Sequence, residues 1–314
     1  MEVFRYSEPD REITEYIDEL NIEHKIYVED SKGERKRHAF KKESEKESFL
    51  CKQQYSKIYD VKYTMLGQFL RWTKGDIWSE NAYIFFGCSF TFGDGLNDDQ
   101  TLPYCFSKYM QFRENVLNYG VIGKSTNFVL NILNSNIIDR YARNAKNKHF
   151  VYSLISDQIM RNFNFPQYGR SDNWLYKDGK WHRAKQPFET VQIVFAKSFI
   201  FRKIFLPIID ESNNKFYEDY MINSLKEIRN LAKSKYNAKF TIIVWPSVKI
   251  DFKERLAMEK FDIIELPEYL EEEEYKIQYD DHPTAKTNEE IAKLLYEHIK
   301  KKNSEEVDNA GKTN

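Results

Sequence analysis

The chain has 314 residues, which is enough for one large domain with a small extension. Its 48 lysine and arginine residues balance 49 aspartate and glutamate residues, and the net charge of -1 gives no general electrostatic reason to bind nucleic acid or an anionic membrane. The three cysteines have no disulfide-framework spacing, so we expect reduced thiols. No apolar run is long enough to span a bilayer, and the first residues lack the apolar core of a signal peptide. The composition therefore predicts a soluble, cytoplasmic protein without a nucleic-acid or membrane partner.

Residues 1–78 are predicted to form an N-terminal extension, whose sequence indicates no function. Apolar positions in residues 13–20 recur at helical spacing after Ser7, so a helix is expected there. The mixed charges of residues 34–47 are typical of a solvated loop or helix face. Apolar residues in 63–72 also repeat at helical spacing and predict a helix packed on the following domain.

The most informative stretch is YIFFGCSFTFGDG at residues 83–95. An apolar run stops at Gly87 and Ser89 follows two residues later, a pattern typical of a buried strand that enters a tight loop. Glycines in such a loop let backbone amides approach a ligand closely. We therefore expect Ser89 at the carboxyl end of a strand, which is the edge where open α/β sheets hold their ligands.

Residues 162–186 have no helical period and are predicted to be an insertion. Within them, two short aromatic segments flank a Lys-Asp-Gly-Lys turn, which indicates a β-hairpin. Trp174, Tyr176 and Trp181 on this hairpin are candidates for substrate binding, either as a lid or as a wall that stacks on a sugar. Cross-strand aromatic pairs that only stabilise the hairpin explain the same residues equally well.

Strands alternate with helices along the remaining chain. This alternation predicts a three-layer α/β/α sandwich on a mainly parallel sheet. The predicted domain spans residues 79–302, and residues 303–314 are expected to form a polar, frayed C-terminal tail. Strands are expected at residues 116–120, 149–155, 240–246 and 262–266, and helices at 100–112, 127–134, 191–205, 213–235 and after 283.

A second informative block, DDHPT, lies at residues 280–284, immediately before the last helical pattern. A nucleophilic serine needs a base that accepts its hydroxyl proton and an acid that holds the tautomer of that base. Ser89, His282 and Asp280 are residues of these three types.

Together, GCSFTFGDG and the late DDHPT resemble two sequence blocks of the SGNH, or GDSL-like, hydrolases, which have a flavodoxin-like α/β/α fold. The resemblance extends over residues 80–300. It implies that Ser89 is the nucleophile, His282 the base and Asp280 the acid. Cys88 occupies the middle position of the family's GDS motif, and the acid precedes the histidine by two residues where three is the commonest spacing. Asp281 is the alternative acid.

Residues 118–126, NYGVIGKST, resemble the second block of the family, which implies that backbone N–H groups of Gly123 and Ser89 form the oxyanion hole. The third block normally contributes an asparagine, but residues 156–162 read SDQIMRN. Gln158 carries the same amide on a longer stem and is assigned to the oxyanion hole, with Asn162 as an alternative. Arg161 in this block either pairs with an acidic residue or binds a substrate anion.

Three other chemistries fit these residues less well. The nucleophile elbow of α/β-hydrolases needs glycine two residues after the serine, and Thr91 is there instead. A metal site at Asp280, Asp281 and His282 lacks a second cluster with ligand spacing, so no metal is expected. Cys88 is a conceivable nucleophile, but as the neighbour of Ser89 it is expected to point into the sheet.

The resemblance therefore implies a cofactor-free serine esterase that forms an acyl-enzyme. A small-molecule or glycan ester, such as an O-acetyl group on a carbohydrate, is the expected substrate. Two alternatives remain open from the sequence. One is a glycan-binding protein of the same fold with weak catalysis, which the missing asparagine suggests. The other is an O-acyltransferase that passes the acyl group to a sugar hydroxyl.

Overall fold

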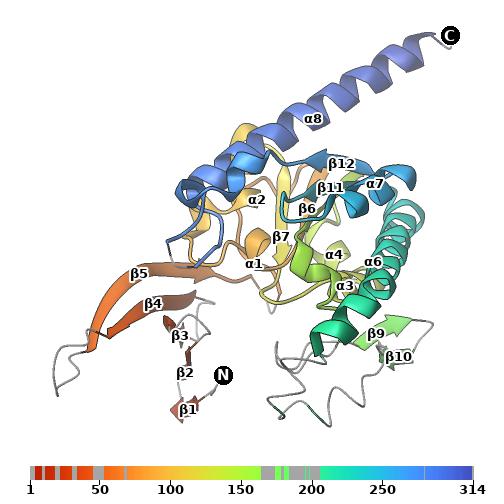
Figure 1. Cartoon of the computed structure of the whole chain (residues 1–314). Coiled ribbons are helices and arrows are strands. Elements are labelled where there is room, and N and C mark those ends of the chain that lie inside the picture. Colours follow the sequence, from red (N-terminus) through yellow and green to blue (C-terminus); the bar gives the residue numbers. More distant parts are fainter. Residues whose placement is uncertain are drawn as a thin grey trace.

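The computed structural model describes most of the chain beyond residue 53 and separate segments before it (Figure 1). The described residues are 4–8, 11–17, 22–29, 34–44, 53–66, 69–163, 174–177, 180–183, 195, 198, 206–278 and 280–312.

A five-stranded parallel sheet forms the centre of the fold, with the strand order β12-β11-β8-β6-β7. In order along the chain this is the 2-1-3-4-5 arrangement, in which the first strand lies where the connections change direction. The neighbouring strands β6 and β7 are almost completely buried, as strands of a parallel sheet covered on both faces are. Their bounds are β6 Asn81–Gly87, β7 Asn115–Gly120, β8 Asn147–Leu154, β11 Ala238–Val244 and β12 Asp262–Glu265.

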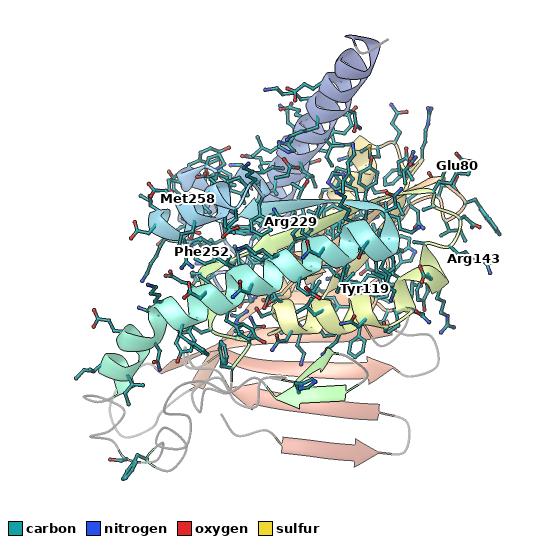
Figure 2. The ribbon with its side chains drawn as sticks, turned by 90° about the vertical axis from the view of Figure 1, so that its right-hand side faces the viewer. Glu80, Tyr119, Arg143, Arg229, Phe252 and Met258 are labelled. Atoms are coloured by element: carbon teal, nitrogen blue, oxygen red, sulfur yellow. The ribbon has the colours of Figure 1, made fainter. Side chains whose placement is uncertain are left out.

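Helices cover both faces of this sheet, so the predicted three-layer α/β/α sandwich is confirmed (Figure 1). One apolar core joins the sheet to α3 (Thr126–Asn134), α4 (Ile137–Tyr141), α6 (Leu206–Tyr236) and α7 (Ile250–Met258). The opposite core joins it to α2 (Leu102–Tyr109) and α8 (Ala285–Lys312). Figure 2 shows α6 lying across the face of the sheet that the first core covers, with Tyr119 among the side chains between α6 and the sheet.

The N-terminal residues form a five-stranded antiparallel sheet in sequential order. Within the described residues, the helices predicted at 13–20 and 63–72, and the loop or helix predicted at 34–47, are therefore wrong. Pairing between neighbouring strands of this sheet decides the structure of these segments more than local periodicity does. The strands are β1 Phe4–Glu8, β2 Arg11–Ile17, β3 Ile22–Glu29, β4 Glu34–Ser44 and β5 Gln53–Thr64.

Two other segments can be compared with the sequence predictions. The hairpin is confirmed, because β9 (Trp174–Lys177) pairs antiparallel with β10 (Lys180–Arg183), and Tyr176 lies opposite Trp181. Helix α8 continues through the segment expected to be a frayed tail, because each added residue extends an existing helix by one hydrogen bond. Most of the helix expected at residues 191–205 lies outside the described residues.

No helix in the described part of the chain is both long enough and apolar enough to cross a membrane.

Candidate active site

Ser89 is the first residue of a short helix, α1 (Ser89–Phe92), that follows directly on β6. Its carbonyl oxygen accepts hydrogen bonds from the N–H groups of Gly93, at 2.8 Å, and Asp94, at 3.0 Å. Gly93 ends the helix at φ 85°, a left-handed conformation that glycine adopts without a steric penalty. Ser89 is thus held at the carboxyl end of β6, where the sheet topology changes direction and ligands bind in such folds. Its side chain is 5% exposed.

Two glycines allow α1 to approach the sheet closely. A Cβ atom at Gly120, the last residue of β7, would lie 2.3 Å from the backbone nitrogen of Phe92. A Cβ atom at Gly87 would lie 2.2 Å from Oγ1 of Thr91. Any larger side chain at either position would push the serine helix away from the strands.

His282 and Asp280 form a hydrogen-bonded pair in the loop before α8. Nδ1 of His282 lies 2.9 Å from Oδ1 of Asp280, and both side chains are largely buried. The intervening Asp281, the alternative acid, adopts φ 51° and is exposed. The contact between the carboxylate and Nδ1 orients the imidazole ring and favours the tautomer that carries its hydrogen on Nδ1. The loop is closed by a 2.7 Å hydrogen bond from the N–H of Ile277 to the carbonyl oxygen of His282.

The serine block and the histidine block meet through Phe90, the residue after Ser89. The Phe90 ring centroid lies 5.3 Å from that of His282. On its other side, Phe90 packs edge-on against Trp245 at 4.7 Å. The indole N–H of Trp245 donates to Oγ of Ser153 at 2.7 Å, which fixes the indole at the end of β11. Trp245 was not among the predicted site residues, although its position directly after an apolar strand was a usable signal.

Gly123, the predicted oxyanion donor, lies in the exposed loop after β7. It adopts φ 74°, and no atom lies within 4 Å of where its Cβ atom would be. The same loop is tied to the serine strand, because the N–H of Val121 donates to the carbonyl oxygen of Gly87 at 3.1 Å. Its part in an oxyanion hole stays a prediction.

Gln158 and Asn162, the two candidates for the missing asparagine, are both buried but differ in their partners. Oε1 of Gln158 accepts the N–H of Ile155 at 2.9 Å, while its Nε2 is buried without a hydrogen-bond partner in the described structure. Asn162 instead accepts from the N–H of Asn127 and donates to Oγ1 of Thr126. Asn162 is therefore committed to holding α3, whereas Gln158 keeps an amide donor available.

The surroundings of Cys88 and Arg161 favour a structural role for both side chains. Cys88 is fully buried, and this burial raises the pKa of its thiol although the Arg161 charge opposes the shift. A buried thiol of this kind is a poor nucleophile, which favours Ser89. Arg161 donates from Nη2 to Oδ2 of Asp157 at 3.0 Å, so the first of its two predicted roles, pairing with an acid, is observed.

The aromatic hairpin packs on α3 through β9. The side chains of Trp174, Tyr176 and Trp181 lie outside the described residues, so their contact with a substrate stays a prediction. His182 is exposed. Across the described residues, no three histidine, cysteine, aspartate or glutamate side chains gather as a metal site would require.

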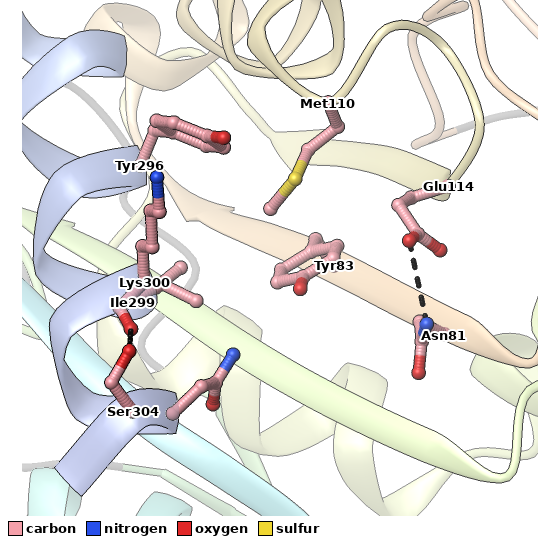
Figure 3. Close-up of a pocket in the computed structure, with 9 residues that line it drawn as sticks. Asn81, Tyr83, Met110, Glu114, Tyr296, Ile299, Lys300 and Ser304 are labelled. Atoms are coloured by element: carbon pink, nitrogen blue, oxygen red, sulfur yellow. Dashed lines mark hydrogen bonds between the residues drawn. The ribbon is translucent and has the colours of Figure 1, made fainter.

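Two hollows on the described surface lie away from these residues. The first, of about 650 Å³, is shown in Figure 3. It adjoins the second, of about 590 Å³, at the amino-terminal end of the sheet, and both are lined by Asn81, Tyr83, Ile299 and Asn303. Ligands of open α/β sheets bind at the opposite, carboxyl edge. The chemistry is therefore assigned to the edge that carries Ser89 and not to these hollows.

Comparisons with known proteins find similar chains among solved structures only. No family model and no curated protein matches the sequence. Among solved structures, the chain is similar to a protein from Desulfitobacterium hafniense DCB-2 that is assigned to the G-D-S-L family of lipolytic proteins, with 8% identity, a TM-score of 0.41, and coverage of 69% of this chain and 98% of that one. It is also similar to the lipase Lip_vut3 from a goat rumen metagenome, with 12% identity, a TM-score of 0.41, and coverage of 69% and 96%.

Proposed function

We propose that this chain is a serine hydrolase of the SGNH type that cleaves a carboxylic ester through an acyl-enzyme. One observation carries the proposal: the imidazole of His282 is held by Asp280 at 2.9 Å and packs on Phe90, the neighbour of Ser89. A serine, a histidine and a buried carboxylate thus share the edge of the sheet at which α/β folds bind ligands.

The proton transfers follow from this arrangement. Asp280 accepts a hydrogen bond from Nδ1–H, which holds the tautomer of His282 in which Nε2 can accept the hydroxyl proton of Ser89. Oγ of Ser89 then attacks the ester carbonyl carbon, and His282 returns the proton to the leaving alcohol. Water, deprotonated by the same imidazole, attacks the acyl-enzyme and releases the carboxylic acid, which restores Ser89.

The negative charge of the tetrahedral intermediate needs donors that are already in place. We assign this role to the N–H groups of Ser89 and Gly123 and to the amide of Gln158, whose Nε2 is buried without a partner in the described structure. Each such donor contributes on the order of 3 kcal/mol to transition-state stabilisation. A longer glutamine stem can thereby replace the asparagine that the sequence lacks.

The proposed substrate is an ester with a small acyl group, such as acetyl, on a carbohydrate. The aromatic hairpin after β8 supports this choice, because aromatic rings are suited to stacking on sugars. The same residues would serve transfer of the acyl group to a sugar hydroxyl, and the test below includes that outcome.

The proposal is tested with a fluorophosphonate probe and with p-nitrophenyl acetate. We expect the full chain to be labelled and to hydrolyse the ester, and Ser89→Ala to lose both. Ser247→Ala is the matched control, because Ser247 follows β11 at the same edge of the sheet. Background turnover and no labelling of the wild type would overturn the proposal in favour of a binding protein. Turnover only with an added sugar acceptor would indicate an acyltransferase.

A further inference from the structure

Residues 61–72 precede the predicted hydrolase domain, yet they contact the loop that follows Ser89. The end of β5 and the chain near Arg71 are joined by a hydrogen bond from the N–H of Trp72 to the carbonyl oxygen of Thr64 at 2.7 Å. The N–H of Arg71 also donates to the carbonyl oxygen of Asn118 at 3.0 Å, which attaches this segment to the edge strand β7.

Arg71 holds the serine loop, defined here as residues 89–98, through its whole guanidinium group. Nη1 donates to the carbonyl oxygens of Phe92 and Gly93, each at 2.8 Å. Nη2 donates to the carbonyl oxygen of Leu96 at 2.7 Å, and Nε pairs with Asp98 at 3.0 Å. These are the last backbone acceptors of α1 and the turn that follows it. Only the planar, multi-donor fork of arginine can satisfy them together.

The guanidinium is fully buried, and its Nε, Nη1 and Nη2 atoms all donate to the serine loop, which separates its role from substrate binding. Arg71 is 0% exposed and lies 4.4 Å from the ring centroid of Tyr63 and 4.8 Å from that of Phe92. Burial lowers the pKa of Arg71, and the carboxylate of Asp98 opposes this shift. A charge with this burial is retained only where its hydrogen bonds are made.

Tyr63 holds the same loop at its centre. Its hydroxyl donates to Oδ1 of Asp94 at 2.8 Å and accepts the N–H of Gly95 at 2.9 Å. Its ring also packs edge-on against Phe92 at 5.0 Å.

The contacts lead back to the nucleophile in one step. Arg71 fixes the carbonyl of Gly93, and Tyr63 fixes the carboxylate of Asp94. The backbone N–H groups of Gly93 and Asp94 are in turn the donors to the carbonyl oxygen of Ser89. The orientation of Ser89 therefore depends on two side chains that never reach the substrate.

We infer that Arg71 and Tyr63 are positioning residues that fix the conformation of the serine loop and thereby set the reactivity of Ser89. The inference rests on the proposed function. It gives the chain before residue 78 a part in the site. Displacing an active-site group by about 1 Å can lower the reaction rate a hundredfold, so residues that only hold the serine loop in place can still control catalysis.

The experiment uses the full chain with two conservative substitutions, Tyr63→Phe and Arg71→Lys. Tyr236→Phe and Arg229→Lys are the matched controls. Tyr236 also donates a buried hydroxyl to a carbonyl oxygen, that of Leu133. Arg229 on α6 (Figure 2) donates to the carbonyl oxygen of Glu259, and the hydrogen bonds of both residues lie outside the serine loop. We would measure the rate of fluorophosphonate labelling, kcat and KM for p-nitrophenyl acetate, and amide hydrogen exchange in residues 89–98.

We expect Tyr63→Phe and Arg71→Lys to lower labelling and kcat by about tenfold or more, with little change in KM and with faster exchange in the serine loop. The controls lose stability but keep the labelling rate. Wild-type labelling of a folded Tyr63→Phe variant overturns the inference, and this variant decides alone if Arg71→Lys does not fold. A wild type that is never labelled overturns the proposed function together with the inference, so the two failures are distinguishable.

Discussion

At the scale of single residues, the shortened Asp-x-His spacing is explained by the residue in between. Asp281 adopts φ 51°, and the N–H of His282 donates to the carbonyl oxygen of Asp280 at 2.6 Å. This tight turn brings the two flanking side chains to the same side, so Nδ1 and Oδ1 meet at 2.9 Å. Aspartate is one of the few residues besides glycine that tolerate the left-handed region. The two-residue spacing is therefore compatible with the hydrogen bond that a catalytic histidine needs.

This geometry predicts different effects for two neighbouring substitutions. Asp280→Asn should lower kcat/KM for p-nitrophenyl acetate by about 10⁴, because an amide at this position favours the wrong tautomer of His282. Asp281→Asn should leave it nearly unchanged, because the Asp281 side chain is exposed and asparagine accepts the same backbone conformation. Equal losses in both variants would contradict the assignment of Asp280 as the acid.

At the scale of elements, the site depends on how closely α1 packs on the ends of β6 and β7. Gly120 faces the backbone of Phe92 and Thr91, so the strand and the helix touch without an intervening side chain. The side chain of Asn118 assists on β7, since its Oδ1 accepts the N–H of Gly120 at 3.0 Å. The position of Ser89 is thus set by contact between backbones.

Gly120→Ala and Gly123→Ala should therefore differ. The first introduces an atom 2.3 Å from the Phe92 nitrogen and should lower the free energy of unfolding by about 3 kcal/mol, with loss of fluorophosphonate labelling. The second meets open space and should cost only about 1 kcal/mol, from its positive φ, while keeping the N–H donor. Chemical denaturation and labelling measure both effects. Comparable losses of stability would show that α1 does not depend on this close approach.

Elements of the central sheet were predictable because their signal is local. A parallel strand buried on both faces reads as a mainly apolar run, as in β6 and β11, and the flanking helices show a clear apolar stripe. The N-terminal strands mix charged and apolar residues, and each strand is stabilised by pairing with the neighbouring strand of the sheet. Their pairing is not visible in a short window, so helical spacing was inferred in residues 13–20 where β2 is found.

At the scale of the whole molecule, contacts cross the predicted boundary at residue 78. Arg71, Tyr63 and Leu70 are buried against residues of the hydrolase domain. A chain that begins at residue 79 would leave three carbonyl oxygens of the serine loop without the Arg71 donors. We expect its thermal unfolding midpoint to fall by about 10 °C or more, since each lost kcal/mol lowers it by a few degrees.

The measurement is differential scanning calorimetry of the shortened and full chains, with fluorophosphonate labelling of each below its transition. An unchanged midpoint and unchanged labelling would establish residue 78 as a true domain boundary. A lower midpoint with weaker labelling would show that residues 61–72 belong physically to the hydrolase domain.

The sequence by itself determined the alternation of strands and helices, the loop that carries Ser89 and the block that carries Asp280 and His282, because each is written in adjacent residues. Only the tertiary structure decided that Phe90 meets His282, that Asn162 is occupied with α3 while Gln158 keeps a donor, and that Arg71 reaches the serine loop. These relations join residues far apart in the chain. They arise from how the sheet and its covering segments pack, which local patterns of residue type do not encode.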